Sequence, residues 1–146
     1  MIPSWAKYSE GLKCLVLGDG EGGGYGWHNL GVVCIHAWPS KIEESWPRSF
    51  FREHQEVLER LMVPVVEAQT DDENDDEDAE VLCRFTPKTA RGFLLMHVFL
   101  HELGHHYDRM LTRKRRRGAG GESHAEDFAR SLVEPLWERY FRVFGG

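Results

Sequence analysis

The chain has 146 residues, of which 41% are hydrophobic and 12% aromatic, and its formal net charge at pH 7 is −6. This composition excludes a disordered chain, and the length suits a single domain over residues 1–146. The net acidity argues against general nucleic-acid binding. Three widely spaced cysteines with no CxxC pair exclude a disulfide framework. No long apolar run and no signal-peptide pattern occur, so we expect no membrane partner and a cytoplasmic location.

The first half of the chain predicts two strands followed by a helix. LKCLVLG (12–18) and LGVVCIHAW (30–38) are rich in the apolar residues of β-strands. The Gly-rich segment between them predicts a hairpin with a long tip. SKIEE has a capping-box pattern and starts a predicted helix over 40–61, which Pro47 breaks or restarts.

The middle of the chain predicts two short strands and a longer helix. VPVVEAQ (63–69) and EVLCRF (80–85) are the strand candidates, and they lie on either side of an acidic loop over 71–80. Thr86 precedes a proline that suits the first position of a helix. A helix from Thr86 to about Met110 is therefore expected.

The remaining elements are a basic loop and a last helix. The loop spans 113–121 and contains Arg113 to Arg117, which could bind nucleic acid or an acidic substrate. The last helix starts near Glu122 and carries one apolar stripe, which Pro135 is expected to kink or split. Together these elements predict an α+β fold, in which a small antiparallel sheet packs beside about three helices.

The segment HVFLHELGHHYD contains the motif HExxH, formed by His101, Glu102 and His105. Residues four apart on a helix project from the same face, so both imidazoles can bind one zinc ion. Glu102 flanks that metal rather than binding it, and there it can take a proton from water. The apolar residues around the motif indicate a buried helix, where unpartnered imidazoles would be costly. The sequence therefore predicts a Zn²⁺ site on this helix.

A third ligand must come from elsewhere in the chain, because catalytic zinc sites usually have three protein ligands. The segment GESHAEDFA offers Glu122, His124, Glu126 and Asp127. His97 and Asp108 lie one turn before and after the HExxH histidines. They either support the histidines or contact substrate, or they are polar residues at the edge of a cleft. His106 could stabilise an oxyanion if the cleft wraps around the helix.

HExxH followed by ESHAEDFA (122–129) resembles the minimal gluzincin zinc peptidases of the ImmA/IrrE-like type. The resemblance covers about a third of the chain, and it implies that Glu122 is the third metal ligand and Glu102 the general base. Glu126 stands where the family has Asp or Asn, the residue that supports a ligating histidine. Glu126 is one methylene longer than Asp and lies one helical turn from Glu122, so Glu126 could itself be the third ligand. His124 is a further alternative.

The expected function is zinc-dependent hydrolysis of peptide bonds, with a protein or peptide as substrate. The alternative is a regulatory or interaction domain of zincin-like fold that binds metal without proteolysis.

Overall fold

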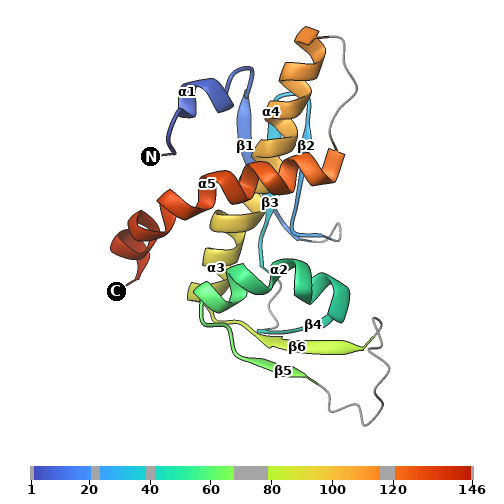
Figure 1. Cartoon of the computed structure of the whole chain (residues 1–146), viewed down its shortest axis with the longest axis vertical. Coiled ribbons are helices and arrows are strands. Elements are labelled where there is room, and N and C mark those ends of the chain that lie inside the picture. The colour runs from blue at the N-terminus through green and yellow to red at the C-terminus, as the bar shows by residue number, and fades with distance from the viewer. Residues whose placement is uncertain (1, 21–23, 39–41, 68–78, 116–120, 146) are drawn as a thin grey trace. The chain divides into compact units, whose positions relative to one another are not determined.

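The computed structural model describes residues 2–20, 24–38, 42–67, 79–115 and 121–145, and it confirms the α+β class. The chain divides into two compact units (Figure 1). Unit 1 comprises Met1–Trp38 and Leu94–Gly146, and unit 2 comprises Pro39–Phe93. Among the described residues, no helix combines the length and the apolar character needed to cross a membrane. The single domain over 1–146 stays a prediction.

Unit 1 combines a small sheet with two long helices. Its elements are α1 (Trp5–Tyr8), β1 (Cys14–Gly18), β2 (Gly26–Asn29), β3 (Val32–His36), a π-helical turn (Leu94–Val98), α4 (Phe99–Arg115) and α5 (Gly121–Phe144). The sheet has the order β1-β3-β2, and α4 contacts β2 and β3. The helix α5 crosses α4 (Figure 1).

The two strands predicted near the N-terminus exist, but the hairpin predicted between them is wrong. β1 pairs parallel to β3, with Cys14 opposite Val32. The Gly-rich segment contributes a strand of its own, β2, which pairs antiparallel to β3. Parallel neighbours need a connection of about a dozen residues or more, and residues 19–31 provide one. A tight turn at Gly31, whose φ is +86°, then joins β2 to β3.

Unit 2 is a three-stranded antiparallel sheet with two helices. Its elements are β4 (Glu43–Pro47), α2 (Arg48–Arg60), β5 (Val65–Glu67), β6 (Glu80–Arg84) and α3 (Pro87–Phe93). The strand order is β4-β6-β5, which confirms the strands predicted within 63–69 and 80–85. Its buried apolar side chains are mostly aromatic or β-branched, and they include Trp46, Phe51, Leu58, Val81, Phe85 and Phe93.

The helix predicted over 40–61 is wrong in its first part. Residues 43–47 form β4, and the helix begins only at Arg48. A proline disfavours helical geometry in the residue before it, so Trp46 is extended and pairs with Val81. Burial of the Trp46 ring then fixes the strand against β6. The predicted restart after Pro47 is confirmed, while the capping Ser40 lies outside the described residues.

The helix predicted from Thr86 to Met110 is present and has a cap at its start. The Thr89 N–H donates to Thr86 Oγ1 over 3.2 Å. The helical segment contains the π-helical turn before α4, and α4 then extends to Arg115. Widened turns of this kind are frequent at functional sites.

The last helix follows the prediction in its start and its apolar face. It begins at Gly121 and buries Ala125, Phe128, Ala129, Leu132 and Tyr140. Pro135 lies inside α5 without splitting it. The acidic residues 71–78 and the side chains of Arg113 to Arg117 lie outside the described residues. Binding of nucleic acid or an acidic substrate by Arg113 to Arg117 therefore stays a prediction.

Candidate metal centre

The close crossing of α4 and α5 brings the two histidine- and glutamate-rich segments together. A Cβ added to Gly104 would lie 3.0 Å from both Cα and the carbonyl oxygen of Ala125. The small residues at this crossing therefore allow backbone-to-backbone contact that a larger side chain would prevent. Around it, one buried apolar cluster fixes the two helices, and it consists of Leu100, Leu103, Phe128, Ala129 and Leu132.

Three potential ligand atoms converge beside this crossing. His101 Nε2 lies 3.0 Å from His105 Nε2 and 3.1 Å from Glu122 Oε2. His105 Nε2 lies 3.2 Å from the same Glu122 oxygen. Zinc bonds of about 2.0–2.1 Å at tetrahedral angles separate ligand atoms by about 3.3 Å. The three atoms thus have the spacing of one face of a zinc coordination tetrahedron.

The hydrogen bonding of His101 directs a lone pair to this point. Its Nδ1 lies 3.2 Å from Glu126 Oε2. A carboxylate only accepts hydrogen bonds, so Nδ1 carries the hydrogen and, in a neutral ring, Nε2 presents its lone pair. That lone pair faces the Glu122 carboxylate and the ring of His105. Such a set of acceptors at close range can be bridged by a metal ion or by a proton.

The electrostatics agree with a positive charge at this point. Burial disfavours a charged His101, but Glu126, Glu102 and Glu122 outweigh it and raise the pKa of His101. Burial lowers the pKa of His105, which favours the neutral imidazole that binds metals. The two histidines outweigh the opposing effect of burial and lower the pKa of Glu122. The side chain of Glu122 is 83% exposed, so this corner of the site faces solvent.

Glu102 lies next to the three atoms and is almost fully buried, with 9% of its surface exposed. Burial raises the pKa of Glu102 to about 7, while His101 acts in the opposite direction. A carboxyl group with such a pKa can take up and return a proton near neutral pH. It has the character of a general base rather than of a permanently charged ligand.

His28 also belongs to the site, and the sequence analysis missed it. From β2 its Nδ1 reaches within 3.4 Å of Glu102 Oε2, and its ring stacks on His105 at 4.6 Å between centroids. Gly26 makes the approach possible, since a Cβ there would lie 3.1 Å from Glu102 Cγ. The sequence signal that could have revealed His28 is the alternation of faces along a strand, since Gly26 and His28 lie on the same face of β2.

The other predicted site residues divide into two groups. His97 and Glu126 lie on the far side of the His101 ring, and the three could share an ion. His106 instead donates from Nε2 to the backbone oxygen of Glu10 over 3.0 Å. It is therefore a structural tie to the N-terminal segment rather than a group of the metal centre.

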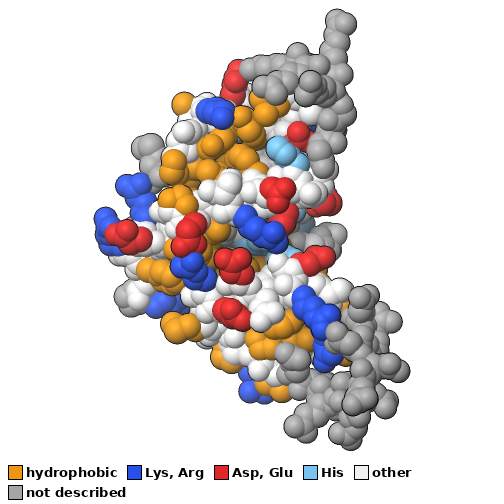
Figure 2. Space-filling view, in the orientation of Figure 1, with side chains coloured by type: hydrophobic (Ala, Val, Ile, Leu, Met, Phe, Trp, Pro, Cys, Tyr) orange, Lys and Arg blue, Asp and Glu red, His pale blue; other side chains and the backbone are white. Residues whose placement is uncertain are grey.

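Asp108 and His124 form a pair of their own. Asp108 Oδ1 lies 3.9 Å from His124 Nε2, and Asp108 is buried. Within the described ranges, three groups could hold an ion, His101–His105–Glu122, His97–His101–Glu126 and His28–Glu102–His105. His124 belongs to none of them. Figure 2 shows histidine side chains reaching the surface beside carboxylates in the region of α4 and α5.

Comparison with known proteins returns no relative. No protein-family model, no curated protein and no solved structure matches the chain. The functional argument therefore depends on the chemistry of the site itself.

Proposed function

We propose that the chain is a zinc-dependent peptidase in which His101, His105 and Glu122 hold the metal. The observation that carries the proposal is the convergence of their three ligand atoms at 3.0–3.2 Å from one another. Two imidazoles and one carboxylate are a ligand set that zinc prefers and that catalytic zinc sites use. When bound, zinc supplies a Lewis acid that polarises a carbonyl and lowers the pKa of water.

The residues around the metal ligands would transfer the proton and hold the catalytic groups in position. Glu102 takes a proton at its carboxylate from the attacking water and returns it to the leaving amine. His28 contacts Glu102 Oε2 and holds that carboxylate beside the ligands. Glu126 accepts the Nδ1–H of His101 and so keeps Nε2 aimed at the metal. The cytoplasm is the proposed compartment, since all three cysteines are unpaired thiols.

Substitution of Glu102 tests the mechanism. Glu102→Gln should keep about one zinc per chain, measured by atomic emission, and lower cleavage of a degenerate peptide mixture by about 10²- to 10⁴-fold. His101→Ala should lose both zinc and cleavage. His54→Gln, which removes a buried histidine of unit 2, is the matched control and should lose neither.

The outcomes separate the rival functions. Full cleavage by Glu102→Gln would reject the mechanism. Stoichiometric zinc without cleavage of any peptide in the wild type would favour a metal-binding domain that is not a protease. Absence of zinc even after it is offered would reject the metal site.

A further inference from the structure

A cavity of about 310 Å³ opens in unit 1 beside the proposed zinc site. Its walls include Lys13, His28, Leu30, His106, Arg109 and Met110. Gly11 provides another part of the wall, and a Cβ there would lie 2.5 Å from Met110 Cε. Because Gly11 has no side chain, the Met110 side chain has room to form part of this wall.

The cavity adjoins the proposed site through two of its residues. His28 lines the cavity and stacks on the ligand His105. Arg109 follows His105 by one helical turn on the same face of α4, at a Cβ separation of about 5–6 Å. Successive residues of an extended peptide advance by about 3.3 Å. A residue one or two positions from a bond held at the zinc would therefore reach this cavity.

The polar lining of the cavity carries positive charge, although the whole chain has a net charge of −6. Lys13 and Arg109 contribute the two cations. Within the part of the chain that the structure describes, neither side chain makes an ion pair or a hydrogen bond. His106 already uses its Nε2 on Glu10, and His28 faces Glu102. The two cations are thus the groups left to meet a ligand, and an Arg fork binds a carboxylate through two parallel hydrogen bonds.

The rest of the lining is apolar. Leu30 is 63% exposed, and Met110 adds a flexible thioether. A ligand with methylene groups and a negative end would bury apolar surface here and meet Lys13 or Arg109 with its charge. A glutamate side chain has this character.

We propose that this cavity is a specificity pocket that selects a peptide residue bearing a carboxylate beside the scissile bond. The carboxylate comes from an acidic side chain or from the free C-terminus of the peptide. The inference rests on the proposed peptidase function and names its substrate class. Lys13 and Arg109 are specificity residues, because they contact the neighbouring residue of the substrate and not the reacting atoms.

Zinc-chelating peptide hydroxamates test the pocket without any need for turnover. Three probes share one backbone and differ in the residue next to the hydroxamate, which is glutamate, glutamine, or a terminal residue with a free carboxylate. Calorimetric titration of the zinc-loaded full chain should show the glutamate probe binding about tenfold more tightly than the glutamine probe, as expected for a charge-assisted hydrogen bond. The third probe shows whether a terminal carboxylate gains the same advantage.

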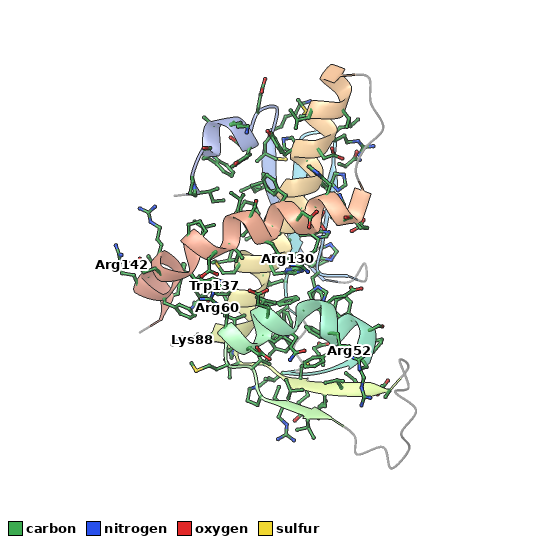
Figure 3. The ribbon with its side chains drawn as sticks, in the orientation of Figure 1. Arg52, Arg60, Lys88, Arg130, Trp137 and Arg142 are labelled. Carbon is green, nitrogen blue, oxygen red and sulfur yellow. The ribbon has the colours of Figure 1, made fainter. Side chains whose placement is uncertain are left out.

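The double variant Lys13→Gln/Arg109→Gln should lose this preference and still bind the glutamine probe. Arg142→Gln is the matched control, since it removes a charge near the C-terminal end of α5 (Figure 3) and should keep the preference. Equal binding of the charged and neutral probes would overturn the pocket and leave the zinc site intact. A preference that survives in the double variant would overturn the role of these two cations. Failure of every probe to bind would overturn the proposed function and this inference with it.

Discussion

Both units bury histidines, but they surround them differently. In unit 2, His54 is 9% exposed and lies among aromatic rings, with centroids 4.1 Å from Phe50 and 5.6 Å from Phe93. Its Nδ1 donates to the Phe50 carbonyl one turn earlier in the same helix, over 2.7 Å. In unit 1, His101 and His105 face each other and a carboxylate that comes from a second helix.

The partners of a histidine on an apolar helix face distinguish a packing role from a site. The Nδ1–H of His54 donates to a carbonyl four residues earlier in its own helix, and the ring packs in the core of unit 2. His101 has carboxylate partners 21 and 25 residues away, supplied only when α5 crosses α4. Carboxylate partners that a distant element delivers to facing imidazoles indicate a built site. A backbone carbonyl partner, within one turn for His54 or in the N-terminal segment for His106, indicates packing.

Removal of zinc should change the free energy of unfolding more than any of the substitutions below. A chelator should lower the free energy of unfolding by about 4 kcal/mol relative to protein in free zinc at 1,000 times its Kd. Denaturant titrations with and without chelator measure the difference. His105→Ala should abolish it. His54→Gln should retain the full zinc-dependent increment despite a lower starting stability, and an increment that vanished in this variant would contradict the distinction.

Gly104→Ala should have the next largest effect. The added methyl group would meet Ala125 at 3.0 Å, so α5 must move away at a cost of up to about 3 kcal/mol. Because Glu122 moves with α5, zinc affinity should fall as well, which a competition assay with a coloured chelator measures.

Gly26→Ala is the matched variant, because its Cβ would instead press from β2 on Val98, on the backbone oxygen of Cys34 in β3 and on Glu102. It should lower cleavage while zinc affinity stays near the wild-type value. Equal loss of zinc affinity in both variants would argue against the specific role of the helix crossing.

Glu126→Ala should weaken zinc binding about tenfold, which corresponds to about 1.4 kcal/mol, because His101 loses the acceptor that fixes its tautomer. Glu126→Gln keeps an oxygen acceptor and should restore most of the affinity. If the alanine variant bound zinc as tightly as the wild type, the support of His101 by Glu126 would be refuted.

The smallest effect is expected at an ion pair of unit 2. Glu43 Oε1 lies 3.0 Å from Arg84 Nε, and both side chains are more than half exposed. Glu43→Ala should therefore change the free energy of unfolding by less than about 1 kcal/mol and leave zinc content unchanged. Glu122 is even more exposed and has equally close partners, yet Glu122→Ala should abolish zinc binding. The same denaturation and metal assays, run side by side, check this contrast.

Much of the candidate site could be predicted from local spacing. The i, i+4 separation of His101 and His105 fixes their common face, and Ala125 in the second segment marks a position that needs a small residue. Glu126 Oε2 lies 3.2 Å from His101 Nδ1, and its role as the support of a metal ligand stays a prediction.

What the sequence did not reveal depends on pairing between distant segments. The Gly-rich segment has little strand propensity, so β2 and its His28 become visible only once β3 is there to pair with. The capping-box pattern before Pro47 competes with the burial of Trp46 against Val81, and burial wins. Tertiary contacts overrode local preference in both cases.

The exposure of Glu122 has a consequence for how zinc would exchange between the protein and solvent. A carboxylate that faces solvent at the first turn of α5 can swing away while the two largely buried histidines of α4 stay in place. Zinc could then enter and leave the folded protein stepwise, through an intermediate held by His101 and His105 alone. Zinc occupancy would then follow the free zinc concentration without unfolding of the chain, which would make the proposed metal centre responsive to metal supply.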